Sequence, residues 1–232
     1  HDRSNKVLAR DIARDYLESC APNAILFTIG DNETYPLWYA QEVEGIRPDV
    51  RVIHVSLLGA DWYINQQRKR VNKSAPIAMT WTPEQYKGDK RNYVMYHDAG
   101  IFPQDIFYNL KEVMQFMGSD DQRAQLLTNS GEYINFLRSQ RLYLPVNKSQ
   151  VIVNGTVTAA DSAHVLAQMT FQVSKNALFK NDLAVLDILA ANNWERPVYF
   201  ANTAIARGVG LENYLRSEGL TYRLVPLSPR QT

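Results

Sequence analysis

The chain has 232 residues, of which 45% are hydrophobic and 21% charged, and its 25 basic and 24 acidic side chains give a formal net charge of +1. These values are ordinary for a globular protein, and a chain of this length can bury a core without a disulfide or a metal. The longest basic run is Arg68-Lys69-Arg70, which argues against nucleic-acid binding because that function needs a clustered basic face.

A helix is predicted near the start of the chain, over residues 5–19. Ser4 can cap it, because a serine hydroxyl accepts a hydrogen bond from a backbone N–H of the first turn. Leu8, Ile12 and Tyr16 recur at a spacing of four and fall on one face. This face is expected to pack against the rest of the chain.

A β-α-β unit is predicted next. The unbroken apolar run 24–29 indicates a buried strand, and residues 50–58 indicate a second one. Residues 30–34 are expected to form a turn and residues 36–44 the connecting helix. Such a unit pairs its strands in parallel through a right-handed crossover, so the two strands are expected side by side in one sheet.

The middle of the chain is less regular, and we treat about residues 72–168 as an insertion. The elements expected before and within it are a helix over 60–70, a short strand at 77–79, a turn or short helix from Thr82, an amphipathic helix over 101–117, and short strands between 133 and 153 split by Pro145 and an Asn147-Lys148 turn. Asn154-Gly155 is a tight-turn signal.

Regular patterns return towards the end of the chain. The expected elements are a strand at 169–173, a helix over 181–192, a strand at 197–201, a helix over 209–218 and a last strand at 220–227. The order predicts one α/β domain over residues 1–232, with a three-layer, Rossmann-like fold and a mostly parallel sheet interrupted by the irregular central insertion. The strands near 24–29, 50–57, 198–201 and 221–225 are expected in one sheet.

The segment after the first strand is the first candidate binding site, since ligands of open parallel sheets bind beyond the carboxyl ends of the strands. Asp31, Asn32 and Glu33 lie there. If the chain stays extended, Asp31 and Glu33 point the same way, and such a carboxylate pair could bind sugar hydroxyls, hold a divalent cation, or act as acid and base. The alternative is that Asp31, Asn32 or Thr34 caps the following helix while Gly30 permits the turn.

Two further segments carry candidate ligand-binding residues. Asn202 and Thr203 follow the strand at 197–201 and could line the same crevice, although turn chemistry explains them equally well. Asp61 stands beside Trp62, a combination of carboxylate and ring that suits carbohydrate stacking. The alternative for this pair is a buried helix start, because large aromatic residues usually serve the core.

No recognised catalytic set is visible in the sequence. Gly208-Val209-Gly210 lacks the remaining residues of a phosphate loop, His54 is expected to be a satisfied core histidine, and His97-Asp98 has no Ser or Cys nearby to complete a triad. The single cysteine, Cys20, allows neither an internal disulfide nor a cysteine-based zinc site. We therefore assign no catalytic residue, metal site or cofactor.

Asp161-Ser162-Ala163 is similar to the short Asp-Ser/Thr-small sequon that directs O-glycosylation in the periplasm of some bacteria. A modifying enzyme must reach the hydroxyl of Ser162, and the polar or small neighbours predict an exposed loop. The alternative is that Asp161 or Ser162 caps a short helix over 164–168.

The stretch 30–51, GDNETYPLWYAQEVEGIRPDVR, resembles the soluble part of a large bacterial family of multi-pass membrane proteins. That family, formerly of unknown function, is grouped with protein O-mannosyltransferase-like glycosyltransferases. The chain is similar to it along nearly its whole length, with further matching segments at residues 1–4, 61–64, 154–156, 192–197 and 218–226. Residues 1–4 resemble the segment that follows the family's last membrane helix.

The resemblance implies an enzyme that takes a sugar from a polyprenyl-phosphate donor outside the cytoplasm, with its catalytic carboxylate in the membrane half. No apolar run here approaches the roughly 20 residues of a membrane helix, so we expect a soluble domain on the periplasmic face of the inner membrane, partnered by its own membrane-spanning half. Its expected role is support of the enzyme by binding the acceptor polypeptide or glycan. The alternative is an independent sugar or small-ligand-binding module that uses the crevice of Asp31 and Glu33.

Overall fold

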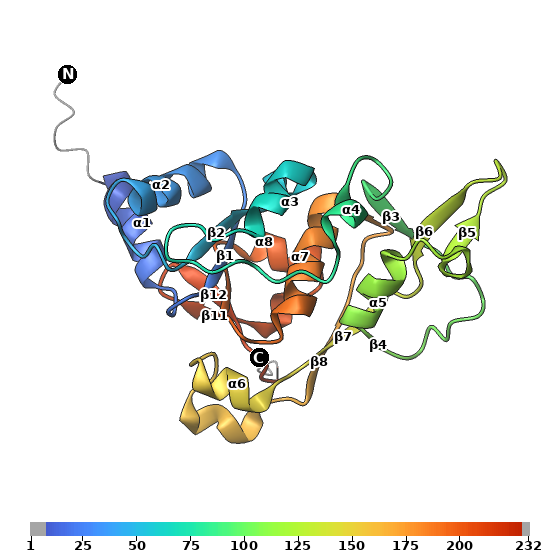
Figure 1. Ribbon diagram of the computed structural model, residues 1–232. Coiled ribbons are helices and arrows are strands. Elements are labelled where there is room, and N and C mark those ends of the chain that lie inside the picture. Colours follow the sequence, from blue (N-terminus) through green and yellow to red (C-terminus); the bar gives the residue numbers. More distant parts are fainter. Residues whose placement is uncertain (1–7, 229–232) are drawn as a thin grey trace.

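The computed structural model describes residues 8–228, and within that range three β-sheets are joined and covered by short helices (Figure 1). The α-helices are α1 (Leu8–Glu18), α2 (Asp31–Glu42), α3 (Asp61–Gln67), α4 (Pro83–Tyr86), α5 (Leu110–Met117), α6 (Lys148–Val153), α7 (Lys180–Asn192) and α8 (Thr203–Gly208). Shorter 3-10 helices span Val55–Gly59, Gln122–Ala124, Ala159–His164 and Glu212–Tyr214. The strands are β1 (Ile25–Thr28), β2 (Arg51–His54), β3 (Tyr93–Tyr96), β4 (Tyr108–Asn109), β5 (Gln125–Leu127), β6 (Tyr133–Leu137), β7 (Arg141–Pro145), β8 (Gln168–Gln172), β9 (Ala177–Phe179), β10 (Val198–Phe200), β11 (Leu215–Glu218) and β12 (Thr221–Leu224).

The largest sheet has five strands in the order β11-β12-β10-β1-β2. β1 pairs in parallel with β2 and with β10, so that Ile25 lies opposite both Arg51 and Val198. The parallel pairing predicted for the first β-α-β unit is therefore confirmed. The four strands expected to share a sheet do share this one.

The predicted fold class, a three-layer Rossmann-like domain with a mostly parallel sheet, is wrong. β12 is antiparallel to both β10 and β11, and the remaining strands form two further mixed sheets, β5-β6-β3-β9 and β4-β7-β8. In these sheets β3 pairs in parallel with β6 and antiparallel with β9, and β7 pairs in parallel with β4 and antiparallel with β8. Mixed pairing across separate sheets thus replaces a single crossover-connected sheet.

The end of the chain shows why the last strand reverses. The predicted helix 209–218 does not form; α8 ends at Gly208, and Leu215–Glu218 is a strand. Glu218 pairs with Thr221, so a turn of two residues, Gly219 and Leu220, joins β11 to β12. So short a connection permits only antiparallel pairing, because parallel strands need a crossover of a dozen or more residues.

The predicted helix 101–117 begins only at Leu110. The side chain of Asn109 accepts a hydrogen bond from Lys111 N–H and caps α5 at this point. Upstream, the chain is irregular and Ile101 is 75% exposed. Arg138 lies over the rings that flank this segment, with its guanidinium carbon 4.9–5.2 Å from the ring centroids of Phe102, Tyr108 and Phe116.

Two short elements predicted for the central region are wrong, and a third is confirmed. Residues 77–79 form no strand. The predicted Asn147-Lys148 turn instead starts α6, because the Asn147 side chain accepts from Gln150 N–H and caps a helix there. The short helix expected near Thr82 is confirmed as α4, with a Thr82–Gln85 capping box.

α1 is a helix as predicted but buries a different face. Ala13 and Leu17 are buried, whereas Ile12 is 43% exposed. The predicted cap at Ser4 and residues 5–7 lie outside the described residues.

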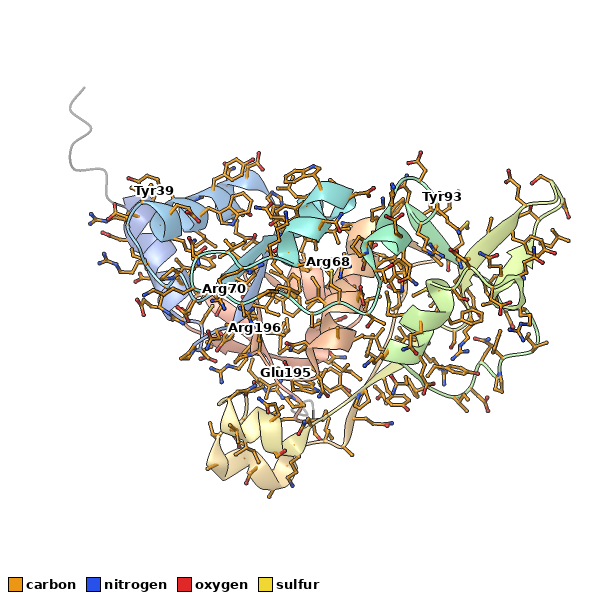
Figure 2. The ribbon with its side chains drawn as sticks, in the orientation of Figure 1. Tyr39, Arg68, Arg70, Tyr93, Glu195 and Arg196 are labelled. Atoms are coloured by element: carbon orange, nitrogen blue, oxygen red, sulfur yellow. The ribbon has the colours of Figure 1, made fainter. Side chains whose placement is uncertain are left out.

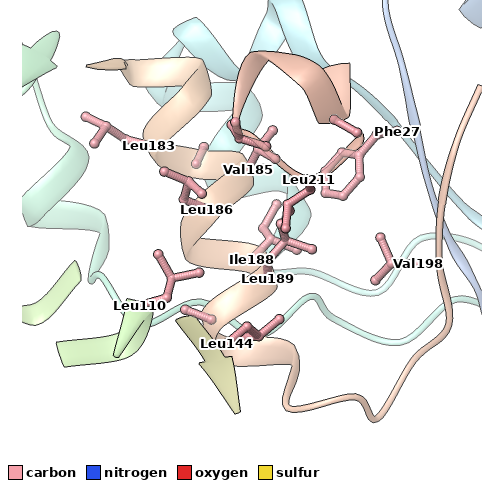
Figure 3. Close-up of a cluster of buried hydrophobic side chains, with 14 of the residues drawn as sticks. Phe27, Leu110, Leu144, Leu183, Val185, Leu186, Ile188, Leu189, Val198 and Leu211 are labelled. Carbon is pink, nitrogen blue, oxygen red and sulfur yellow. The ribbon is translucent and has the colours of Figure 1, made fainter. Parts of the chain in front are cut away.

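The main core surrounds α7, which is buried on nearly every side (Figure 3). Its apolar side chains pack with residues that are far apart in the sequence, among them Phe27 of β1, Leu110 of α5, Leu144 of β7 and Leu211. A second cluster between α1, α2 and the opposite face of the large sheet contains Leu17, Leu26 and Leu37. Side chains alternate along β1, so α7 covers one face of the large sheet while α1 and α2 cover the other.

Candidate functional site

Asp31, Asn32 and Glu33 form the first turn of α2, five residues before the predicted helix start. The Glu33 carboxylate accepts a hydrogen bond of 2.7 Å from the backbone N–H of Ile29, which precedes the N-cap residue Gly30. Asn202 Nδ2 donates to both Glu33 oxygens at 3.2 and 3.3 Å. The structure therefore brings Asn202 to Glu33 at the carboxyl ends of β1 and β10, where the carboxylate is engaged by the protein itself.

Asn202 and Thr203 also start α8. The side-chain oxygen Oδ1 of Asn202 accepts from Ala204 N–H at 3.0 Å, which makes Asn202 the helix cap, and Thr203 is the first helical residue. Asn202 thus has a structural role as a helix cap, and Thr203 occupies the first position of the helix.

Asp31 lies against a buried histidine. Its Oδ1 atom is 3.2 Å from His54 Nε2, and His54 is 2% exposed at the end of β2. The carboxylate can only accept, so the proton of a neutral His54 lies on Nε2. Within the described residues His54 Nδ1 has no partner, so His54 is buried as predicted but is not fully satisfied. A hydrogen bond from Tyr35 to the Asp31 carboxylate raises the pKa of the Tyr35 hydroxyl.

A cavity of about 570 Å³ lies beside this cluster and is lined by residues of α2, β2 and α3. Its walls carry four aromatic side chains, Tyr35 and Trp38 from α2 and Trp62 and Tyr63 from α3. We call it the aromatic groove. Its other lining residues are Gln41, Glu42, Pro48, Val50, Arg51, Val52, Leu57, Gln66, Gln67, Val71 and Asn72.

The floor of the groove is the outer edge of β2, the last strand of its sheet. Arg51 N–H donates to Ala24 O on the β1 side, so the backbone groups of alternate residues face the groove. Side chains of the flanking helices bind them: Gln41 Nε2 donates to Val50 O at 2.8 Å, Trp38 Nε1 donates to Val52 O at 3.4 Å, and Tyr63 Oη accepts from His54 N–H at 3.0 Å. These bonds protect the strand edge from pairing with another chain.

Among the residues that the structure describes, Arg51 is the one cation that lines the groove, and it is fully engaged. Arg51 is 3% exposed, and its guanidinium donates to the carbonyl oxygens of Gln67, Lys69, Ser74 and Ala75 and to the hydroxyl of Ser74. Burial lowers the pKa of Arg51 to about 10. Arg51 therefore holds the loop that closes one wall, and offers no free charge to a ligand.

The exposed polar side chains stand at the rim of the groove. Glu42, Gln66 and Asn72 are exposed, and Asn72 Nδ2 donates to Glu42 Oε1 at 2.6 Å. Trp62 is 62% and Tyr35 50% exposed, so both rings present a face to solvent. A ring platform beside a planar amide and a carboxylate can stack a flat ligand and bind its hydroxyls.

A family model described as TMEM260-associated domain 2 matches residues 9–232. The chain belongs to this family. No curated protein and no solved structure matches the chain. Membership in a TMEM260-associated domain family is in keeping with the resemblance to a membrane-protein family found from the sequence. Among residues 8–228, none of the helices combines the length and the apolar character needed to span a bilayer.

The sequence identified a candidate residue on one wall of the aromatic groove, Trp62, but not the aromatic residues of the opposite wall. Trp62 lines the groove, whereas Asp61 does not and instead accepts from Lys180 Nζ at 2.5 Å and from Gly88 N–H at 2.7 Å. Tyr35 lies outside the predicted helix, which starts at residue 36, so its relation to Trp38 inside that helix was missed. Their spacing of three would have put both on one helical face once Tyr35 was included.

The part of the chain that the structure describes contains no group of three His, Cys, Asp or Glu side chains placed to share a metal ion. In a second cavity of about 770 Å³ beside β11, Arg223 donates to Glu218 and to Tyr199, and Arg216 donates to the carbonyl oxygen of Ser228. We therefore place the candidate site at the aromatic groove.

Ser162 lies in the 3-10 helix Ala159–His164 rather than on an open loop. It is half-buried, and its hydroxyl donates to Ala159 O at 2.7 Å. Thr158 caps this helix by accepting from Asp161 N–H, so the predicted helix over 164–168 is replaced by one that starts earlier.

O-glycosylation of Ser162 remains a prediction, and it requires the short helix to open for the modifying enzyme. We expect the protein purified from its native host to carry a mass increment that maps to residues 158–164 and disappears in Ser162→Ala. The measurement is intact-mass and peptide-level mass spectrometry. An unmodified wild-type mass would contradict this prediction.

Proposed function

We propose that the chain is a non-catalytic, extracytoplasmic domain of a polyprenyl-phosphate-dependent membrane glycosyltransferase of the protein O-mannosyltransferase-like type, on the periplasmic face of the inner membrane. In this role it holds the acceptor of that enzyme in the aromatic groove. Membership in the TMEM260-associated domain 2 family supports the link to a membrane glycosyltransferase. The aromatic groove is the observation that carries the proposed role.

The physical properties of the groove suit holding rather than reacting. Its volume of about 570 Å³ falls within the range of roughly 300–1,000 Å³ that ligand sites occupy. Its backbone edge and its buried cation are already bonded within the fold. Binding an acceptor here would raise its local concentration at the membrane-embedded catalytic centre, which accelerates transfer without any reacting group in this domain.

The test is sugar transfer by the full-length membrane protein with substitutions in the groove. Losing the Trp62 ring removes about 1.5–3 kcal/mol of contact, so Trp62→Ala should raise KM for the acceptor roughly 10–100-fold, with little change in kcat, because ground-state and transition-state binding weaken together. Tyr93→Ala is the matched control. Tyr93 is 57% exposed on β3, at a distance from the groove (Figure 2).

An unchanged acceptor KM in Trp62→Ala, or an equal rise in Tyr93→Ala, would contradict the proposed role. Loss of transfer in Asp31→Ala alone would favour the alternative, a ligand module centred on Asp31 and Glu33. The observed engagement of Asp31 by His54 and of Glu33 by Ile29 and Asn202 gives that alternative less support.

A further inference from the structure

The aromatic groove has chemical features that narrow the class of its ligand. It combines ring faces open to solvent with a small number of rim groups that donate and accept hydrogen bonds. Three observations distinguish among an extended polypeptide, a charged sugar phosphate and a neutral sugar ring as its occupant.

The first observation concerns an extended polypeptide. Such a ligand is recognised most strongly by adding a strand to a free sheet edge. β2 is an edge strand, but Gln41 and Tyr63 already occupy the backbone groups of Val50 and His54. Strand addition would require these bonds to break, so the groove is poorly suited to a polypeptide backbone.

The second observation concerns charge. A sugar phosphate or a polyprenyl phosphate needs a cation or free backbone N–H groups. Within residues 8–228, Arg51 is the one cation that lines the groove, and carbonyl oxygens and Ser74 surround its guanidinium. Glu42 adds a negative charge at the rim. The groove therefore disfavours an anion and fits an uncharged ligand.

The third observation concerns the match to a sugar ring. Trp62 presents an exposed indole face, and the C–H face of a pyranose can stack on such a surface. Asn72 Nδ2 donates a hydrogen bond of 2.6 Å to Glu42 Oε1. The two side chains thus place an amide donor beside a carboxylate acceptor. Adjacent sugar hydroxyls, each a donor and an acceptor, can bridge such a pair.

We infer that the aromatic groove binds an uncharged pyranose ring, stacked on Trp62 with its hydroxyls on Glu42, Gln66 and Asn72. This inference rests on the proposed function and makes the ligand class a glycan of the acceptor, not its polypeptide and not the phosphorylated donor. The ring enters from the solvent side, where Trp62 and Tyr35 are exposed.

The test titrates this chain with neutral methyl pyranosides of glucose, galactose and mannose, and with glucose 6-phosphate as the charged counterpart. Binding is followed by calorimetry and by tryptophan fluorescence. Trp81 and Trp194 are buried, so a fluorescence change reports on the groove. We expect millimolar binding of at least one neutral pyranoside, at least tenfold weaker in Trp62→Ala and in Asn72→Ala, unchanged in Tyr93→Ala, and no tighter for glucose 6-phosphate.

Absence of binding up to about 50 mM, where even a free energy near −2 kcal/mol would be detected, would overturn the inference. Tighter binding of glucose 6-phosphate, or equal losses in Trp62→Ala and Tyr93→Ala, would also overturn it. Trp62 is exposed, so Trp62→Ala is expected to keep the wild-type melting temperature. Asn72 has φ 51°, so Asn72→Ala is expected to melt slightly lower, and its binding is measured well below that melting temperature.

The two proposals can fail separately. If no pyranoside binds while Trp62→Ala still raises the acceptor KM in the full-length enzyme, the carbohydrate inference falls and the acceptor-holding role stands. If pyranosides bind in the groove while the Trp62→Ala transfer kinetics match wild type, the inference stands and the acceptor-holding role falls.

Discussion

Replacing Asp187 with alanine is expected to lower the free energy of unfolding by about 3–5 kcal/mol. Asp187 is fully buried in α7. Its carboxylate accepts from Thr80 N–H at 2.7 Å, from Trp81 N–H at 3.1 Å and from the Tyr86 hydroxyl at 2.8 Å. Alanine would leave these donors buried without an acceptor and would detach the segment before α4 from the core.

For a chain of this size the loss corresponds to a melting temperature lower by roughly 10 °C, measured by thermal unfolding followed by circular dichroism. Asp187→Asn is the matched variant, because it keeps the shape and one acceptor oxygen, and it should lose less than Asp187→Ala. A change of less than about 1 kcal/mol in Asp187→Ala would contradict the structural role assigned to this carboxylate.

The comparison of wild type with Asp187→Asn also gives a test of how stability depends on pH. Burial raises the pKa of Asp187 in the folded state, so the folded protein holds this proton more tightly than the unfolded chain does. The stabilisation that the bound proton of Asp187 provides is fully present below the pKa of an aspartate in the unfolded chain, near 3.9. This stabilisation is lost as the pH rises through the raised pKa of Asp187 in the folded protein. The stability of wild type relative to Asp187→Asn should therefore fall as pH rises above about 4. A difference that stays constant with pH would contradict this shift.

Gly210→Ala is the second substitution with a large expected effect, a loss of about 2–5 kcal/mol. Gly210 has φ 84°, and a Cβ atom there would lie 2.2 Å from the carbonyl oxygen of Gln172 at the end of β8. The backbone contact joins the segment after α8 to the β4-β7-β8 sheet, and it cannot be relieved by moving a flexible side chain. Urea unfolding measures the loss.

Gly45→Ala separates the cost of the positive φ from the cost of the close contact with Gln172. Gly45 has φ 66° but nothing within 4 Å of an added Cβ, so alanine there meets only the conformational penalty of about 1–2 kcal/mol. Gly210→Ala should cost clearly more than Gly45→Ala. Equal losses would show that the close approach to Gln172 contributes nothing.

β1, β2 and β10 could be predicted because they lie in short, largely apolar runs of sequence, and α7 because its apolar pattern is long. The direction of β12 could not, since it depends on whether residues 209–218 form a helix. Val209, Leu211 and Tyr214 are all buried, and such spacing suits a helix as well as the turn and strand that form. The two-residue turn at Gly219 and Leu220 then decides the topology.

The candidate site was predictable only in part for a similar reason. Trp62, named from the sequence as a candidate for carbohydrate stacking, lines the groove. The opposite wall depends on where α2 begins, and proline rules place that start at Pro36, whereas the helix begins at Asp31. Asp61 was a candidate for ligand binding, but its carboxylate pairs with Lys180. Lys180 is distant in the sequence, so no local pattern could reveal that pairing.

Photo-crosslinking in the full-length membrane protein tests most directly whether the aromatic groove holds the acceptor. A benzophenone side chain is introduced at Gln66, on the rim of the groove, or at Tyr93 on β3, and irradiation takes place during turnover, with cross-linked products mapped by mass spectrometry. We expect acceptor cross-links from position 66 and none from position 93. Acceptor cross-links from position 93, or their absence at position 66 while transfer proceeds, would contradict it.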